Sequence, residues 1–297
     1  MYESRSAGPQ VEFWENSMKD LLTEPARKTS LFGGKISVPV DMAELRSQYE
    51  HARPFPHVVI DNLIDTVLLE QVVAQMPSMV EKNWVHEDDE HLEKFNLRSA
   101  VELPGAGFDL ASMLHSANFL YFLSELTGIE NLLPDPYLQG SGYHVVPRGG
   151  HFDIHSDRNV AYATGLTRRL AMIIYLNKDW KHEYGEQLEL WNSDASRCEA
   201  VVEPEFNKTV IFQVADPNYH GLPSPVACPA GSSRNSFAVY YHTVGVEGKR
   251  DFTPHSSLYA PNSHKRAKLT FSGLLKDMTP PMLLRSMKKM RRKGKHD

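Results

Sequence analysis

The chain has 297 residues, of which 41% are hydrophobic, and a formal net charge of -5 at pH 7. It is long enough to bury the core of one catalytic domain with extensions. No stretch approaches the roughly 20 apolar residues that span a bilayer, and no basic start followed by an apolar run indicates secretion. The two cysteines, Cys198 and Cys228, are too few for a disulfide framework, so we expect a reduced, cytoplasmic location.

Residues 1–54 show no clear period, and we predict an N-terminal arm with a helix around Trp14. Residues 55–135 form a predicted helical support region that begins with a strand over His57–Asp61. Asp65 is placed to cap a helix that runs through Gln75, and Ser116–Thr127 is a second helix closed by Gly128. We expect these helices to brace a β-sheet from outside. The acidic run at residues 87–90 is predicted to be a solvated loop.

Residues 136–245 contain short apolar runs separated by Asn, Asp, Gly and Pro. The runs are Leu170–Leu176, Gln187–Trp191, Thr209–Phe212 and Ser236–Tyr241. Short strands between such turns are typical of a β-sandwich or barrel. The predicted fold is therefore mainly β with flanking helices (α+β), with the β core in this region.

Charge is concentrated in the last segment, residues 246–297, which we predict to be a basic extension. From Gly245 to the end there are thirteen Lys and Arg against four Asp and Glu, a net charge of +9, so the remainder carries -14. After Pro281 a stripe of apolar residues has helical spacing: Leu283, Leu284, Met287 and Met290. Such a basic amphipathic helix either docks on the body or contacts an anionic membrane or an acidic partner. We expect no nucleic-acid partner, and no Walker-type or dinucleotide-binding glycine pattern occurs.

The motif His155-Ser156-Asp157, with His220 far along the chain, suggests a metal site. Side chains at positions i and i+2 of a strand point the same way, so His155 and Asp157 can bind one ion. Two histidines and one carboxylate can occupy one face of an octahedral Fe(II), leaving positions for a co-substrate and O2. Arg234 and Ser236 have the same spacing, which sets a guanidinium and a hydroxyl on one face to hold a carboxylate.

A second H-x-D, formed by His151 and Asp153, lies in the same predicted strand. By alternation His151, Asp153, His155 and Asp157 all project to one side, so geometry alone does not choose between the pairs. Asp157 ends the strand, where a turn exposes it, and this favours the later pair as ligands. The earlier pair then either contacts substrate at the pocket mouth or forms a solvated strand face.

The order of motifs resembles the Fe(II)/2-oxoglutarate-dependent oxygenases, in particular their prolyl-4-hydroxylase-like branch. It runs H-x-D, then Tyr175–Trp180 (YLNKDW), then Gly185–Leu188 (G-x-x-L), then a histidine and R-x-S. Leu126–Ile129 and Pro134–Tyr137 resemble a bacterial subgroup of unassigned substrate. The resemblance covers roughly residues 55 to 245, and it implies a double-stranded β-helix (jelly-roll, cupin-like) core.

By family role, His155, Asp157 and His220 would hold Fe(II). Arg234 would pair with the distal carboxylate of 2-oxoglutarate, while Tyr175 and Ser236 would donate hydrogen bonds to it. O2 is the second co-substrate, and ascorbate is a candidate further cofactor. The implied reaction hydroxylates an unactivated C–H bond and releases succinate and CO2. Because Asp157 occupies a ligand position, no position is vacant for a halide, and we do not expect halogenation.

Two departures from the family pattern concern the pocket. The family usually shows G-G-E-L where this chain has Gly-Glu-Gln-Leu at residues 185–188. It often places a tyrosine shortly before the glycine pair, where this chain has Val145-Val146-Pro147. Tyr143 is the nearest phenol and the candidate for that co-substrate contact. Arg158 and Asn159, which follow Asp157, are candidate substrate contacts together with His151 and Asp153.

The substrate class stays open between a small molecule, a sugar and a peptidyl residue. A non-redox cupin-like protein that binds Zn or Ni would explain the three ligands but would leave Arg234 and Ser236 without a purpose. A prolyl or peptidyl hydroxylase acting on a protein is the second alternative.

Overall fold

A computed structural model of the chain describes residues 29–31, 35–38, 41–80, 84–97, 100–245 and 253–261. The chain divides into two units, residues 1–261 and 262–297, and the described residues all belong to the first. The helices predicted around Trp14 and after Pro281 lie outside the described residues. No helix among those described has the length and apolar character needed to cross a bilayer.

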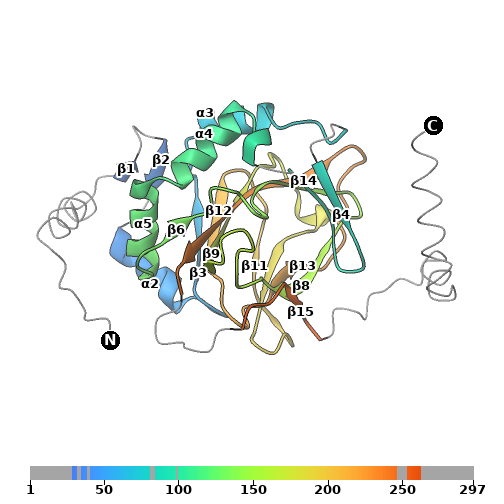
Figure 1. Cartoon of the computed structure of the whole chain (residues 1–297). Coiled ribbons are helices and arrows are strands. Elements are labelled where there is room, and N and C mark those ends of the chain that lie inside the picture. The colour runs from blue at the N-terminus through green and yellow to red at the C-terminus, as the bar shows by residue number, and fades with distance from the viewer. Residues whose placement is uncertain are drawn as a thin grey trace, which may run out of the picture. The chain divides into compact units, whose positions relative to one another are not determined.

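The larger of two main sheets is antiparallel and contains most of the long strands (Figure 1). Its order is β3 (His57–Asp61), β12 (Lys208–Gln213), β9 (Thr167–Tyr175), β14 (Ser233–Thr243), β7 (Gly142–Pro147), β5 (Glu93–Leu97) and β4 (Trp84–Asp88). A short strand, β6 (Leu133–Pro134), also pairs with β14. The predicted strands at residues 57–61, 170–176, 209–212 and 236–241 all lie within or overlap this sheet.

The smaller main sheet faces the larger one. Its order is β11 (Cys198–Val202), β10 (Leu188–Trp191), β13 (His220–Leu222), β8 (Phe152–Ser156) and β15 (Leu258–Tyr259). A separate two-stranded pair is formed by β1 (Thr29–Leu31) and β2 (Ile36–Val38). Apolar side chains from both main sheets pack together between them, among them Ala171, Leu188, Val210 and Phe212. Two such facing antiparallel sheets form the double-stranded β-helix that the sequence predicted.

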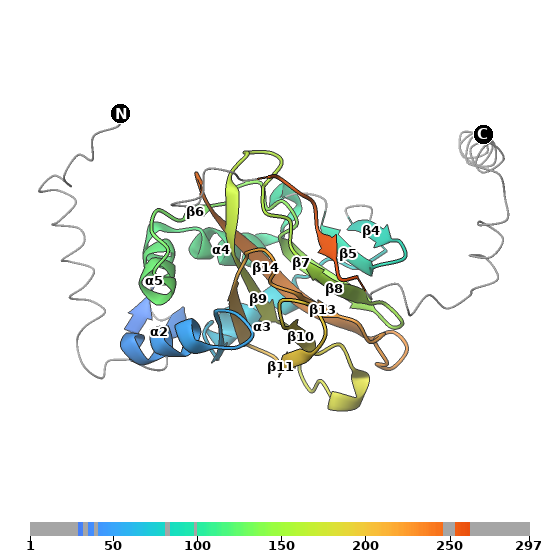
Figure 2. The same cartoon turned by 90° about the horizontal axis from the view of Figure 1, so that it is seen from below.

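Helices cover the outer face of the large sheet, away from the small sheet (Figure 2). They are α2 (Met42–His51), α3 (Thr66–Ala74), α4 (Gly105–Leu114) and α5 (Ala117–Thr127). The described residues also include two short 3-10 turns, η1 (Ala100–Glu102) and η2 (His182–Tyr184), and Tyr184 of η2 packs against the apolar cluster between the sheets. The predicted cap of α3 is confirmed, because the Asp65 carboxylate accepts from the Leu68 amide at 3.0 Å. Gly128 ends α5 with φ of 68°, a conformation that favours glycine.

Two segments contribute more to this body than the sequence indicated. Helix α2, which falls in the predicted N-terminal arm, buries Leu45 and Tyr49 in the core beneath the large sheet. Strand β15, which falls in the predicted basic extension, pairs with β8.

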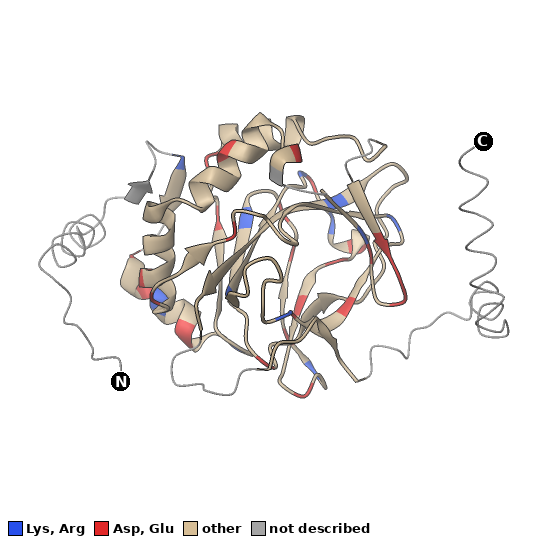
Figure 3. Cartoon of the chain, in the orientation of Figure 1, with Lys and Arg blue, Asp and Glu red and all other residues tan. Residues whose placement is uncertain are grey.

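The prediction of a solvated loop at residues 87–90 is wrong for its first half. Residues 84–88 form β4, which pairs with β5 and places Glu87 opposite Lys94. Figure 3 marks acidic residues of this strand in red. The strand is held because Trp84 is buried and its indole donates to the Ser78 carbonyl at 3.0 Å. The polar sequence of this segment did not indicate a strand, because β4 lies at the edge of the sheet and its side chains other than Trp84 are exposed to solvent.

A β-bulge interrupts the pairing of β8 with β13. His220 lies opposite His155 and Leu222 lies opposite Phe152, so β8 uses three residue steps where β13 uses two. Gly221 faces the extra residue. A Cβ atom at Gly221 would lie 2.7 Å from the Asp153 carbonyl oxygen and 2.9 Å from the Ile154 Cα. Only glycine allows the two backbones to approach this closely.

We predict that Gly221→Ala destabilises the protein by about 1–3 kcal/mol, because the added methyl group meets fixed backbone atoms and forces β8 and β13 apart. The variant should also bind divalent metal more weakly than the parent, since His155 and His220 lie on these strands. Denaturant unfolding and Mn(II) titration measure the two effects. Gly245→Ala is the control, because its Cβ meets nothing within 4 Å; equal behaviour of the two variants would contradict the account.

Candidate metal and co-substrate site

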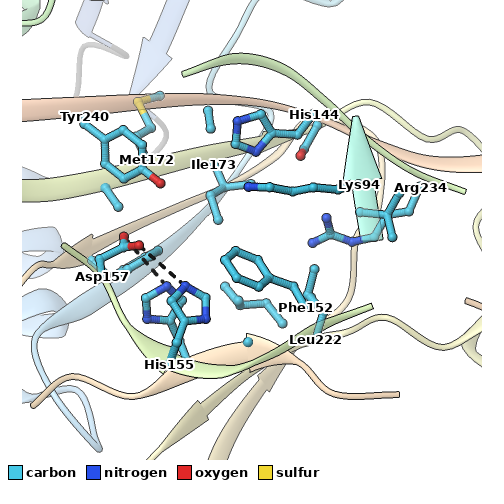
Figure 4. Close-up of a pocket in the computed structure, with 18 residues that line it drawn as sticks. Lys94, His144, Phe152, His155, Asp157, Met172, Ile173, Leu222, Arg234 and Tyr240 are labelled. Carbon is cyan, nitrogen blue, oxygen red and sulfur yellow. Dashed lines mark ion pairs between the residues drawn. The ribbon is translucent and has the colours of Figure 1, made fainter. Parts of the chain in front are cut away.

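Three predicted ligands converge between the sheets (Figure 4). His155 lies in β8, Asp157 follows the end of that strand, and His220 opens β13 opposite His155. The Nε2 atom of His155 lies 3.5 Å from one Asp157 carboxylate oxygen, and the Nε2 atom of His220 lies 3.8 Å from the other. All three side chains are buried, and their potential ligand atoms lie within 4.8 Å of one another.

Backbone carbonyls orient both imidazoles. The Nδ1 atom of His155 lies 2.8 Å from the Asp153 carbonyl oxygen, and that of His220 lies 3.1 Å from the Asn218 carbonyl oxygen. Because a carbonyl only accepts, each Nδ1 carries the proton and each Nε2 presents a lone pair toward Asp157. This is how proteins orient metal-binding histidines.

The site passes a chemical test for a divalent metal. The His155 Nε2 and one Asp157 oxygen are buried and have no hydrogen-bond partner among the described residues. Buried acceptors without a partner are costly, and a bound cation removes that cost. Two imidazoles and one carboxylate form the donor set of non-haem Fe(II) sites. The residues present therefore fit Fe(II).

The charge states also suit ligands. Burial alone would raise the pKa of Asp157, but the adjacent imidazoles of His155 and His220 and the Arg168 guanidinium hold it well below its ordinary value. Burial, and then the proximity of His155, lowers the pKa of His220 to about 4. Around neutral pH the site presents an ionised carboxylate and a neutral His220 imidazole.

The bulge in β8 separates the two H-x-D pairs. The expectation that all four side chains project to one side is wrong, because the extra residue shifts the alternation between Phe152 and His155. The carboxylate of Asp153 instead lies 3.2 Å from His91 Nδ1, and neither His151 nor Asp153 lines the pocket beside the candidate ligands. Their predicted role as substrate contacts in that pocket is not supported.

The pocket beside the ligands has mainly apolar walls with a few polar groups (Figure 4). Its apolar lining comprises Val146, Phe152, Ala171, Met172, Ile173, Leu188, Phe212, Leu222 and Ala238. Its other polar groups are Lys94, His144, Arg234, Ser236 and Tyr240. Few convergent polar groups in an apolar cleft are typical of a small-molecule site.

Arg234 and two predicted partners lie together. Arg234 is only 3% exposed, its Nε donates to the Glu186 carbonyl at 3.1 Å, and its guanidinium lies 5.0 Å from the Tyr175 ring centroid. Ser236 is in register with Tyr175, whose buried hydroxyl has no partner among the described residues. Within the part of the chain that the structure describes, no carboxylate forms an ion pair with Arg234. A buried guanidinium in this setting fits a carboxylate ligand.

The prediction that Tyr143 contacts the co-substrate is wrong. Along β7, His144 and Val146 line the pocket, so Tyr143 between them points to the opposite face. Its hydroxyl donates to the Val72 carbonyl at 2.8 Å, and its ring packs edge-on against Phe237 in the helix-covered core.

Arg158 and Asn159 do not line this pocket either. The Asn159 side chain donates to the Thr253 carbonyl at 3.1 Å and accepts from the His255 amide at 3.0 Å, which anchors residues 253–261. Arg158 lies over the Tyr162 ring at 4.7 Å. Adjacency in sequence to Asp157 did not predict orientation, because the chain leaves the strand at that point.

Sequence reasoning missed Lys94, His144, Phe152 and Tyr240, all of which line the pocket. Lys94 and His144 can be assigned to the pocket only when β5 is known to pair with β7. In that pairing Asn96 lies opposite His144, which places β5 beside the pocket-lining face of β7. Tyr240 could have been found, because it continues the alternation of Arg234 and Ser236 along β14.

Glu186 was also missed as a buried acid. It stands where the family usually has a glycine, with a left-handed φ of 60° and 1% exposure. Neither carboxylate oxygen has a partner among the described residues. Burial raises the pKa of Glu186 well above its ordinary value, although the positive charge of Arg234 acts in the opposite direction.

A pair of imidazoles and a carboxylate beside a buried arginine, between the sheets of a double-stranded β-helix, defines a class of non-haem iron enzymes. Comparison with known proteins shows what this region is similar to. Residues 139–242, from just before β7 into β14, match the family model of the 2OG-Fe(II) oxygenase superfamily. The match includes the candidate ligands and Arg234 but less than half of the chain, and enzymes of that superfamily use Fe(II), 2-oxoglutarate and O2. A search of curated proteins finds no match.

Solved structures with a similar fold include prolyl hydroxylases. A Pseudomonas putida prolyl-4-hydroxylase has 16% identity and a TM-score of 0.46, over 67% of this chain and 98% of that chain. A Trichoplax adhaerens prolyl hydroxylase in complex with a hypoxia inducible factor peptide has 16% identity and a TM-score of 0.49, over 68% and 88%. HygX from Streptomyces hygroscopicus, with nickel, 2-oxoglutarate and hygromycin B bound, has 11% identity and a TM-score of 0.43, over 68% and 93%.

We predict that Glu186→Gln stabilises the metal-free protein more at high pH than at low pH. A raised pKa in the folded state means that the folded protein retains a proton that the unfolded chain releases, so the parent loses stability as pH rises. Glutamine does not titrate. The gain in melting temperature should therefore be larger at about pH 9 than at about pH 5. Glu183→Gln, at an exposed neighbouring position, is the control, and a pH-independent difference for Glu186→Gln would contradict the assignment.

Proposed function

We propose that this protein is an Fe(II)- and 2-oxoglutarate-dependent hydroxylase that oxidises an unactivated C–H bond of its substrate and releases succinate and CO2. The observation that carries the proposal is one pocket lined by His155, Asp157 and His220 together with a buried Arg234 that forms no ion pair among the described residues. When bound, iron with 2-oxoglutarate and O2 supplies the oxidative chemistry.

In this proposal the chain binds and orients. His155, Asp157 and His220 hold the metal through three donors, which leaves other positions for the co-substrate. Arg234 pairs with the distal carboxylate of 2-oxoglutarate, because a planar guanidinium matches a carboxylate with two parallel hydrogen bonds. Tyr175 and Ser236 are placed beside Arg234 to donate further hydrogen bonds to the same group.

The pocket walls would exclude water from the reacting groups. Phe152 stacks on His155 with ring centroids 3.9 Å apart, and Phe212 lies 4.6 Å from His220. These rings cover the histidines from the apolar side and lower the local dielectric constant. Charge interactions inside the pocket are therefore stronger than in water.

The proposed substrate is a small molecule, a sugar or a peptidyl residue, since pocket-lining loops and not the fold decide this choice. A cytoplasmic location stays our proposal, and it agrees with the unpaired state of Cys198 and Cys228. The competing function, metal binding without redox chemistry, predicts no succinate from 2-oxoglutarate.

We predict that the protein converts 2-oxoglutarate to succinate when Fe(II) is added, and that His155→Ala abolishes both metal retention and this reaction. His151→Ala is the matched control, because His151 lies in the same segment but does not line the pocket. Metal analysis after dialysis and quantification of succinate measure the two effects. Full turnover in His155→Ala, or its loss in His151→Ala, would contradict the ligand assignment.

We predict that Arg234→Met raises the 2-oxoglutarate concentration needed for half-maximal succinate formation by roughly 10- to 100-fold, the value of a charge-assisted hydrogen bond. Affinity for Mn(II) should change little, since Arg234 is not a metal ligand. Arg197→Met, at an exposed site on β10–β11, is the control. An unchanged requirement for 2-oxoglutarate would remove Arg234 from the binding site.

A further inference from the structure

We propose that Lys94 is the second cation of the co-substrate site and binds the carboxylate of 2-oxoglutarate next to the metal, as Arg234 binds the distal one. This inference rests on the proposed function. It adds a residue of β5 to the co-substrate pocket, where the sequence suggested a contact by Tyr143, whose phenol faces the helix-covered core instead.

The position of Lys94 supports this role. Its side chain runs from β5, which lies between β7 and the edge strand β4, into the pocket, with the ammonium group directed between the walls (Figure 4). Only 12% of the side chain is exposed. The Nζ atom lies 4.6 Å from the Phe152 ring centroid, and Phe152 stacks on His155 at 3.9 Å. Phe152 therefore contacts both this ammonium and a candidate metal ligand.

The charge of Lys94 is incompletely paired. Its nearest acid is Glu87, at 3.6 Å from Nζ, which is longer than the 2.7–2.9 Å of a charge-assisted hydrogen bond. The same Glu87 oxygen accepts from the Asn96 amide at 2.6 Å, and the Glu87 side chain is 44% exposed. A largely buried ammonium with one screened partner is costly, and a carboxylate in the pocket would remove that cost.

The two cations lie on opposite sides of β7, Lys94 on β5 and Arg234 on β14. Burial lowers the pKa of Lys94, and the acids that oppose this effect are Glu87 and Asp157, the candidate metal ligand. Arg234 instead lies beside Glu186, whose backbone carbonyl accepts from the Arg234 Nε. 2-Oxoglutarate has one carboxylate at each end, so its charges match this separation.

His144 is not a third cation in the pocket. Burial, and then the charge of Lys94, lowers the pKa of His144 to about 3, and its Nε2 lies 2.9 Å from the Gly140 carbonyl oxygen. His144 is therefore neutral, and Lys94 and Arg234 supply the positive charge of the lining. An acidic group of the primary substrate is the competing partner for Lys94, and it is separated from the co-substrate by the experiment below.

The test is equilibrium dialysis of labelled 2-oxoglutarate against the full-length protein loaded with Mn(II), which reports binding without turnover. Lys94→Met should weaken binding by roughly 10- to 100-fold, and Lys94→Arg should retain most of it. Lys178→Met is the control, because Lys178 is an exposed lysine paired with Glu70 outside the pocket. Glu87→Gln should tighten binding, since it removes the acid that competes for Lys94.

Two competitors then locate the contact. Pyruvate keeps the keto group and the carboxylate beside it, whereas levulinate keeps the keto group and the distal carboxylate. Lys94→Met should weaken competition by pyruvate and spare levulinate, and Arg234→Met should do the reverse. Equal effects on both competitors, or binding of 2-oxoglutarate by Lys94→Met within about twofold of the parent at equal metal loading, would overturn the inference and favour a substrate acid.

The outcomes also separate this inference from the proposed function. A parent protein that binds Mn(II) but no 2-oxoglutarate contradicts both. A parent that binds 2-oxoglutarate alongside an unaffected Lys94→Met contradicts the role of Lys94 alone. If Lys94→Met does not fold, as thermal unfolding would show, Glu87→Gln decides: unchanged affinity for 2-oxoglutarate in that variant overturns the inference.

Discussion

The close approach of β8 and β13 is the constraint on which the site depends. The two strands meet where Gly221 faces the Asp153 carbonyl, and a bulge at that point sets His155 opposite His220. The same bulge turns Asp153 toward His91 and brings Phe152 and His155 to the pocket. Bulges beside active sites commonly re-aim side chains in this way. The large sheet, packed on its helices, supplies the rigid wall from which Arg234 and Ser236 face these ligands.

Buried charge is the second organising feature. One pocket contains or borders an ionised Asp157, a buried Arg234, a largely buried Lys94 and a buried Glu186. Such groups are costly without partners, and the described residues leave several of them unpaired. A divalent metal would pair with the Asp157 carboxylate, and a dicarboxylate would pair with Arg234 and Lys94. The ligands that the 2OG-Fe(II) oxygenase superfamily uses therefore explain why these charged groups are buried together. A purely structural role for the same groups would not explain it.

Much of this could be predicted from local sequence. Alternation along a strand predicted that the side chains of Arg234 and Ser236 point to the same face. Capping residues predicted where α3 begins and where α5 ends. The failures have physical causes. Strict alternation put His151 and Asp153 on the ligand side, because a bulge is set by the partner strand and cannot be read from β8 alone. Tyr143 was taken as the nearest phenol, yet its strand position points it away. The position of Lys94 in the pocket could not be predicted locally, because it depends on the pairing of a polar segment, β5, with β7, which is distant in sequence.

In our proposal, His155, Asp157 and His220 hold one metal in a pocket whose far end binds a carboxylate through Arg234. An anaerobic crystal structure of the protein with Mn(II) and 2-oxoglutarate tests it most directly. The account predicts one metal ion at roughly 2.0–2.2 Å from a ligand atom of each of the three residues, with a carboxylate of 2-oxoglutarate on the Arg234 guanidinium. A metal bound by His151 and Asp153, or 2-oxoglutarate placed away from Arg234, would contradict it.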